Sequence, residues 1–414
     1  MERLYLRRRR HTIRNRHGQV IVLVVIALAV LVMVVGLAID IGYAWRARLK
    51  MQAAADAAAI AGTDALFNGA GVSVSSAAQS VATQNGFTSG AGTPINSNPV
   101  TVTVNNPPAS GPYAGNSDAV EVIISQAQPT YFLAVAGFTS LNVSARAVAA
   151  IKSAPVCIYS LNPSASGALN MAANTTVNSN CGVMVNSNNS AALIGASGAT
   201  ISAPALGVVG GISFSGSLPP NTVTGVAPAA DPLAALPAPP VGGSCTTLAP
   251  IGPNVTANLP AGYYCGLTVR SNSTVNLTSS GTYSFNGDLS LSSNTALNGT
   301  GVTLYFKSGS LQMSSNTTLN LSAPTSGTYA GIVIFEDRAN TAPLSLSSNS
   351  GMTLTGAVYA PAATLTLASN AFTNAYSILV ASTVNIAANS TININADYSS
   401  LPGGSPIKTA VAVE

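Results

Sequence analysis

Charged and aromatic residues are scarce in this sequence. Asp, Glu, Lys and Arg together make up 7% of its 414 residues, aromatic residues make up 6%, and there is a single tryptophan. The two histidines, His11 and His17, both lie near the N-terminus. Residues 18–414 therefore cannot hold a catalytic triad of serine, histidine and aspartate. No phosphate-binding loop or dinucleotide fingerprint is present, so we expect no bound cofactor.

Carboxylates are too few and too dispersed to suggest catalysis. An enzyme that cleaves sugar polymers on a β-helix needs paired carboxylates or a calcium cluster on one face. The only acidic cluster is Glu336 and Asp337, followed by Arg338. Neighbouring residues in a strand point to opposite sides, so we predict a solvated loop end or a structural ion pair there. The alternative is a weak ligand site that also uses Asp288. We expect no catalytic residues and no metal site.

Cysteine occurs four times, and all four residues follow residue 150: Cys157, Cys181, Cys245 and Cys265. None has C-x-x-C spacing or a nearby histidine, which argues against zinc. Disulfides persist outside the cytoplasm, and four cysteines allow three pairings. Of these we favour the local pairs Cys157–Cys181 and Cys245–Cys265.

One long apolar run stands out against this polar background. Residues 20–39, from Val20 to Ile39, are all apolar. A helix of about 20 residues crosses the roughly 30 Å hydrocarbon core of a bilayer. A cleavable signal peptide is the alternative, but the run is too long and no A-x-A-like site follows it. We therefore predict a retained single transmembrane helix over 20–39.

The charges on either side of the run predict its orientation. Seven arginines precede it, whereas only Arg46, Arg48 and Lys50 follow it closely. The more basic flank stays in the cytoplasm, so residues 1–19 form a cytoplasmic tail and the bulk lies on the far side. Residues 1–50 have a net charge of about +8 and the remainder about −4. Since the basic charge belongs to this tail, we interpret it as a topology signal and expect no nucleic-acid partner.

Asp40 ends the apolar run. A carboxylate at this position is costly unless it reaches the interface or finds a partner. We predict either a boundary residue in headgroup water or a contact with a neighbouring membrane helix.

The helix is predicted to continue beyond the membrane over residues 40–66. This stretch is rich in alanine, the strongest helix former, and contains no proline. Ala54, Ala57, Ala58 and Ala61 fall on one face at the spacing i, i+3, i+4, i+7. Such a face of small residues permits close packing, either on the protein's own next domain or on another subunit.

Residues 67–151 are predicted to form a small α/β domain. A short helix is expected over 72–82, and strands over 100–104, 119–125 and 141–151. Between the last two strands, residues 130–137 are typical of one or two helical turns. A long N-terminal helix followed by a small sheet is the general plan of pilin-like subunits.

The remainder is repetitive. An Asn flanked by Ser, Thr or Ala recurs at spacings of 22, 22, 33, 21 and 19 residues, at Asn272, Asn294, Asn316, Asn349, Asn370 and Asn389. Short alternating segments with Val, Leu and Ile lie between them. This period predicts a right-handed parallel β-helix over 152–217 and 257–400, with Asn at left-handed corners. The alternative is a β-sandwich. A proline-rich loop is expected over 218–256 and a tail over 401–414.

Three N-terminal stretches carry a resemblance to a known family: residues 14–19 (RNRHGQ), 36–43 (GLAIDIGY) and 49–59 (LKMQAAADAAA). They resemble the N-terminal domain of TadG-like proteins of bacterial tight-adherence (Tad, or Flp) pilus systems. The resemblance implies a bacterial inner-membrane protein with its bulk in the periplasm or outside the cell. Many relatives carry a von Willebrand A-type domain with a metal site, but its D-x-S-x-S motif is missing here.

Together these patterns predict a mostly β, non-enzymatic, membrane-anchored and exported protein of Flp pilus assembly or surface adhesion. Alternatives are a β-helical polysaccharide-binding or polysaccharide-acting protein and a minor pilin-like subunit. The expected partners are the lipid bilayer, other pilus-assembly proteins and surface polysaccharide.

Overall fold

The computed structural model describes residues 17–68, 73–153, 156–347, 352–368, 377–398, 401 and 404–414. The chain forms two compact units, residues 1–152 with 410–414 and residues 153–409. The predicted basic tail falls almost entirely outside the described residues, as do Asn349 and Asn370.

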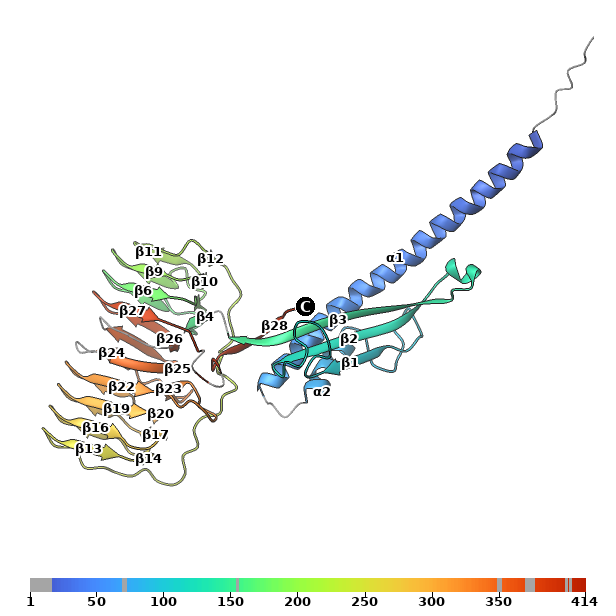
Figure 1. Ribbon diagram of the computed structural model, residues 1–414. Helices are drawn as coiled ribbons and strands as arrows, with labels where there is room; N and C mark the ends of the chain where they lie inside the picture. The colour runs from blue at the N-terminus through green and yellow to red at the C-terminus, as the bar shows by residue number, and fades with distance from the viewer. Residues whose placement is uncertain are drawn as a thin grey trace, which may run out of the picture. The chain divides into compact units, whose positions relative to one another are not determined.

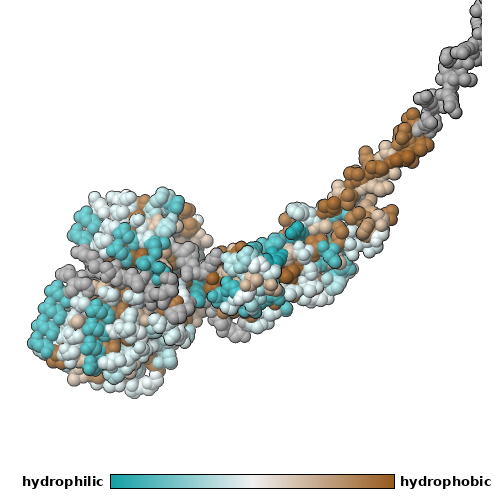
Figure 2. Space-filling model, in the orientation of Figure 1, coloured by the Kyte–Doolittle hydropathy of each residue, from teal (hydrophilic) through white to brown (hydrophobic). Residues whose placement is uncertain are grey.

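The first unit begins with one uninterrupted helix, α1 (His17–Asn68). Its 52 residues give a length of about 78 Å at 1.5 Å per residue. Each large apolar residue from Val20 to Val35 exposes more than half of its side chain, and Figure 2 shows this part of the surface as hydrophobic. Within the described chain, α1 is the one helix long and apolar enough to span a membrane. It is therefore a candidate membrane anchor.

A small sheet and a second helix pack against the C-terminal half of α1. Helix α2 (Val74–Gln84) starts at Ser73, whose hydroxyl accepts the Ser76 N–H at 3.1 Å. The sheet has the order β1-β2-β3-β28, with the strands β1 (Thr101–Asn105), β2 (Ala119–Pro129), β3 (Ser140–Ser153) and β28 (Lys408–Ala412). The chain end predicted as a tail thus supplies a strand of this sheet instead.

Strands β2 and β3 form a long antiparallel hairpin, with Ala119 opposite Ala150 and Pro129 opposite Ser140. Its turn contains a short 3-10 helix, η1 (Leu133–Ala136), which ends at Gly137 with φ +91°. Figure 1 draws this turn beside α1. The helical turns predicted over 130–137 correspond to η1.

The second unit is a parallel β-solenoid of about ten turns with three faces. The first face consists of β13 (Thr256–Leu259), β16 (Thr274–Leu277), β19 (Ala296–Thr300), β22 (Thr318–Ser322), the start of β25 (Met352–Ala368), β27 (Thr391–Ile394), β6 (Thr176–Ser179) and β9 (Thr200–Ser202). The second consists of β15 (Leu267–Val269), β18 (Leu289–Leu291), β21 (Leu311–Met313), β24 (Leu344–Ser347), the ends of β25 and β26 (Ser377–Ile386), β5 (Leu169–Met171), β8 (Leu193–Gly195) and β11 (Ile212–Phe214).

The third face consists of β14 (Gly262–Tyr264), β17 (Gly281–Asn286), β20 (Val302–Ser308), β23 (Ile332–Glu336), the middle of β25, the start of β26, β4 (Val156–Ser160), β7 (Gly182–Val185), β10 (Leu206–Val208) and β12 (Thr222–Thr224). All strand pairings described in this unit are parallel, so the β-sandwich alternative is wrong.

The turns do not stack in sequence order. The last turn of the 257–398 segment pairs with the first turn of the 156–224 segment: β26 pairs with β4 and β5, and β27 pairs with β6. The two predicted β-helical parts therefore form one continuous stack, and the chain enters it in the middle. The proline-rich linker must run from one end of the stack to the other.

Asparagine turns the corner before the first face. Asn272, Asn294, Asn316 and Asn389 all have φ between +56° and +59°, as the repeat predicts for left-handed corners. The Nδ2 of Asn294 donates to Oδ1 of Asn272 at 3.1 Å, and Asn316 repeats this bond to Asn294. At the corresponding corner of the 193–202 turn stands Gly198, with φ +77°.

Aligned aromatic and aliphatic side chains fill the core. Tyr264, Phe285 and Phe306 follow one another in register, and the last two rings stack with centroids 5.3 Å apart. Leu267, Leu289 and Leu311 form an equivalent row on the second face, each at most 4% exposed. Burying each such side chain contributes roughly 1.5–3 kcal/mol, so these rows define the register between turns.

Candidate functional site

The alanine-rich half of α1 packs on its own domain. Ala54 and Ala58 are buried, as are Ala55 and Ala59, which the prediction did not include. Ala57 and Ala61, which it did include, are only half-buried. The buried stripe is therefore rotated toward Met51. This stripe contacts α2 and β2, so the small residues permit close packing within the unit.

Asp40 finds a partner within its own unit, the turn of the β2–β3 hairpin. Its side chain is 2% exposed, and its carboxylate accepts three backbone N–H groups of the hairpin turn. The donors are Tyr131 at 2.9 Å, Phe132 at 2.9 Å and Leu133 at 2.7 Å. The first N–H groups of a helix have no intrahelical partner, and a carboxylate satisfies them well. Asp40 therefore joins the end of the apolar run to the start of η1.

Two further contacts attach the hairpin turn to α1. The Phe132 ring occupies the space where a side chain at position 36 would lie, which only Gly36 leaves free. Tyr43 and Tyr131 meet edge to face with ring centroids 6.1 Å apart. The turn is thus attached to α1 over two helical turns.

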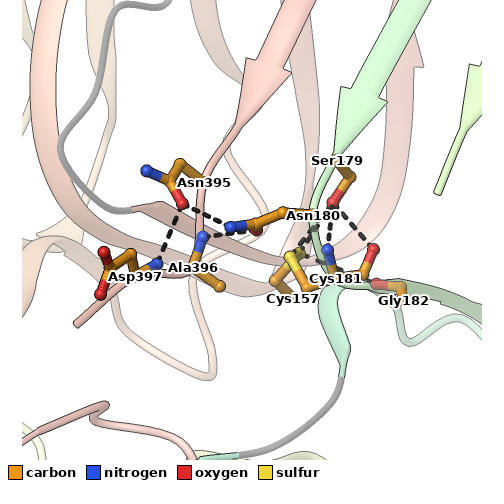
Figure 3. The surroundings of a disulfide bond; sticks show 8 residues. All are labelled: Cys157, Ser179, Asn180, Cys181, Gly182, Asn395, Ala396 and Asp397. Atoms are coloured by element: carbon orange, nitrogen blue, oxygen red, sulfur yellow. Dashed lines mark hydrogen bonds between the residues drawn. A yellow bond between two sulfur atoms is a disulfide. The ribbon is translucent and has the colours of Figure 1, made fainter. Parts of the chain in front are cut away.

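Both cysteine pairs have the local connectivity that the spacing favoured. Cys157 and Cys181 join adjacent turns of the third face, with Cα atoms 5.7 Å apart. Figure 3 shows this bond at the seam between the two segments, where Nδ2 of Asn180 donates to Oδ1 of Asn395 at 2.6 Å. Both the covalent bond and the amide contact stabilise the middle of the stack.

The second pair, Cys245–Cys265, fixes the end of the linker to the first turn of the 257–398 segment, with Cα atoms 4.9 Å apart. Backbone pairing of Thr246 with Tyr264 supports the same attachment.

The three acidic residues considered as a ligand site, Asp288, Glu336 and Asp337, do not converge on one side of the third face. Glu336 is fully buried and takes the place that Phe306 occupies in the preceding turn. Its Oε1 accepts the Ser310 hydroxyl at 3.0 Å, and Oε2 has no hydrogen-bond partner. The exposed Asp288 accepts the Ser310 N–H at 2.9 Å. Ser310 thus connects Asp288 to Glu336, but only one of the two carboxylates is accessible.

Asp337 points to the opposite side of the strand, as alternation predicts. Its Oδ2 accepts the Tyr305 hydroxyl at 2.6 Å and its Oδ1 the Ala339 N–H at 2.9 Å. Among the described residues, no three His, Cys, Asp or Glu side chains gather closely enough to hold a metal ion.

Arg338 holds the proline-rich linker against the stack. Its guanidinium lies over the rings of Phe335 and Tyr359, at 5.7 and 5.4 Å from their centroids. It also donates to the carbonyls of Leu233 and Leu236 at 2.7 and 2.8 Å. These bonds fix the middle of the linker, which covers aromatic side chains on the outer side of the third face.

The outer side of the first face carries rows of Thr and Asn. Thr256, Thr274 and Thr318 follow one row, with Ala296 in register between the last two. The neighbouring row consists of Asn258, Asn276, Asn298 and Asn320, whose amides bond from turn to turn at 2.9 to 3.4 Å. After the seam the pattern recurs, with Asn178 donating to Asn393 at 2.9 Å. This face is uncharged and rich in hydrogen-bonding groups.

The N-terminal part of the first unit matches a family model. Residues 18–81 match the model of the family described as "Putative Flp pilus-assembly TadE/G-like". Residues 18–81 carry a TadE/G-like domain. No curated protein and no solved structure matches the chain.

The TadE/G-like domain comprises nearly all of α1 and most of α2. The hairpin turn, the linker and the solenoid follow it in the sequence. Sequence reasoning missed the hairpin turn and Arg338 as contact-forming residues. A concentration of apolar residues at 131–138 was the one available signal for the turn.

Proposed function

We propose that this chain is a membrane-anchored, exported and non-enzymatic structural protein of Tad/Flp pilus assembly or surface attachment. The observation that carries the proposal is the TadE/G-like domain, whose apolar helix exposes the side chains of residues 20–35. Exposed apolar surface on this scale indicates an interaction site, and the length of this helix fits a bilayer. The arginine-rich flank supports an orientation with the N-terminus in the cytoplasm and the solenoid on the far side of the inner membrane.

A structural role for the solenoid is supported by where its carboxylates lie. Glu336 is buried, and Asp337 accepts hydrogen bonds from Tyr305 and Ala339. Paired accessible carboxylates of the kind used in sugar hydrolysis are absent from the described acidic candidates. The stack instead offers long, regular, uncharged faces, which suit it to act as a spacer or contact surface.

Replacing Val30 in the middle of the apolar run with Arg is expected to weaken membrane insertion, so that carbonate extracts a larger fraction of the protein. A central Arg costs about 2.5–3.5 kcal/mol in membrane insertion. The measurement is fractionation of bacterial membranes after alkaline carbonate extraction. The matched control is Ile95→Arg, because Ile95 is 66% exposed but lies outside the run.

A deletion strain tests the pilus role separately. Loss of piliation or adhesion, restored by the wild-type gene, is expected, and copurification with assembled pili would favour a minor pilin-like subunit. Normal piliation and adhesion after deletion would overturn the pilus role. Wild-type protein extracted by carbonate would overturn the membrane anchor.

The Thr/Asn face supports a second candidate function, the binding of surface polysaccharide. Hydroxyl and amide groups at a spacing of about 4.8 Å between turns suit repeated hydrogen bonds to a neutral polymer. Asn276→Lys with Asn320→Lys is expected to reduce retention on immobilised surface polysaccharide at least tenfold. Ser290→Lys with Gln312→Lys adds the same charge on the second face, where these two residues are in register. Equal retention of both double variants would rule this surface out.

A further inference from the structure

The turn of the β2–β3 hairpin exposes large apolar side chains. Tyr131 is 59% exposed, Phe132 43%, Val135 91% and Phe138 64%. No charged residue occurs between residues 122 and 145. Aromatic and apolar groups at an exposed, uncharged loop tip are unfavourable in water, so the turn has the character of a contact surface.

The turn is fixed at the depth where the apolar run of α1 ends. Phe132 packs on Gly36, which lies inside the run. Gly36 precedes Ile39 by three residues, or about 4.5 Å along the helix axis. A bilayer that covers residues 20–39 of α1 therefore extends to the level of the hairpin turn.

Aromatic residues gather where this bilayer would meet water. Tyr43 contacts Tyr131 edge to face, and Trp45, which is 59% exposed, follows two residues later on α1. Tyr and Trp are enriched at membrane interfaces because their rings are apolar and their N–H or O–H groups reach water. The first basic residues beyond them are Arg46 and Arg48.

The polar backbone of the turn is satisfied internally. Asp40 accepts the N–H groups of 131, 132 and 133. The N–H groups of Val135, Gly137 and Phe138 donate to carbonyls within the same turn at 3.0 to 3.2 Å. Backbone groups near hydrocarbon need such partners because lipid supplies none. The same bonds stabilise the Asp40 carboxylate, which is 2% exposed and therefore shielded from the surrounding medium.

We propose that the β2–β3 turn is a second membrane contact, which inserts Phe132, Val135 and Phe138 into the outer interfacial layer of the bilayer beside α1. The proposal rests on the membrane anchoring proposed above. We favour lipid over a protein as the partner of this turn, because the apolar patch continues directly from the apolar part of α1. Two attachments would restrict the tilt of α1 and of the packed sheet relative to the membrane.

Fluorescence of single tryptophans in the full-length protein tests this contact. Trp45→Phe removes the one native tryptophan, and Phe138→Trp then places a reporter in the turn. Ile95→Trp is the matched control, since Ile95 and Phe138 are 66% and 64% exposed. Ile95 lies near Lys50 and Met51, beyond the run.

In liposomes with bromine-labelled phosphatidylcholine, the turn reporter is expected to lose at least half of its emission and the control reporter almost none. Val135→Trp serves as a second turn reporter should Phe138→Trp disturb folding.

Three outcomes would overturn the proposal, and they are distinguishable. Equal accessibility of both reporters to aqueous acrylamide, without lipid quenching, means that the turn stays in water. Protection from acrylamide without lipid quenching means that a protein, such as a second copy, covers the turn. Extraction of the protein from the liposomes by carbonate would overturn both the membrane anchor and the turn contact. If the protein resists carbonate but the turn reporter is not quenched, only the turn contact is overturned.

Discussion

Raising the pH from about 5 to about 9 is expected to destabilise the solenoid by on the order of 4 kcal/mol through Glu336 alone. Burial raises the pKa of Glu336 to about 8, although the hydrogen bond from Ser310 lowers it in part. The corresponding pKa in an unfolded chain is 4.5. Between these values the folded protein retains a proton that the unfolded chain releases. The stability therefore falls as the pH rises through this window, and the loss is complete above the folded pKa.

The variant Glu336→Gln should remove this dependence, because the amide has a similar shape and does not ionise. Chemical denaturation of the full-length protein at a series of pH values measures the effect. Ser310→Ala removes the hydroxyl that donates to Glu336, so the loss of stability should move to a higher pH. A Glu336→Gln variant that keeps the wild-type slope would contradict this account.

The architecture of the solenoid was predictable because each residue type in its repeat has a definite structural role. Alternating Val, Leu and Ile fill the core, and Asn adopts the left-handed corner, so both signals occur at a fixed phase of each turn. The order of the turns was not predictable. Each turn presents a similar pattern, and Asn178 and its partner Asn393 are 215 residues apart. Nothing local marks which turn closes the seam.

In the first unit, too, the elements were predictable from the sequence but their contacts were not. The long helix followed from composition, but two adjacent stripes of it consist of alanine. Packing on α2 and β2 selected the stripe with Ala55 and Ala59, which propensity could not distinguish from Ala57 and Ala61. The partners of Asp40 are backbone N–H groups 91 to 93 residues away, and backbone groups leave no side-chain signal in the sequence.

The acidic cluster was half predictable. Alternation indicated that Glu336 and Asp337 point to opposite sides. It could not indicate which of them enters the core, because the linker that covers the other side crosses from a distant part of the sequence.

The second large effect concerns the sheet of the first unit, where Arg146→Met is expected to cost about 3 kcal/mol. Arg146 forms ion pairs with Glu121 and Glu414, and Glu121 is fully buried. Burial by itself raises the pKa of Glu121, but hydrogen bonds from Asn105, Arg146 and Ala109 hold it below its usual value. Removing Arg146 leaves a buried carboxylate without its cation, and this loss should be largest above the unfolded pKa of the carboxyl group.

Hydrogen exchange in the full-length protein distinguishes a loss of stability in this sheet from a loss of stability in the solenoid. Amides of β2 and β3 should exchange faster in Arg146→Met, whereas those of β17 and β20 should not change. Adding Glu121→Gln should restore much of the protection, because the uncompensated charge is then removed. Glu414→Gln should have a small effect, since Glu414 is partly exposed and Arg146 keeps its bond to Glu121. If Glu121→Gln fails to rescue Arg146→Met, the arginine stabilises the sheet through its packing and its bond to the Ser110 carbonyl and not through charge.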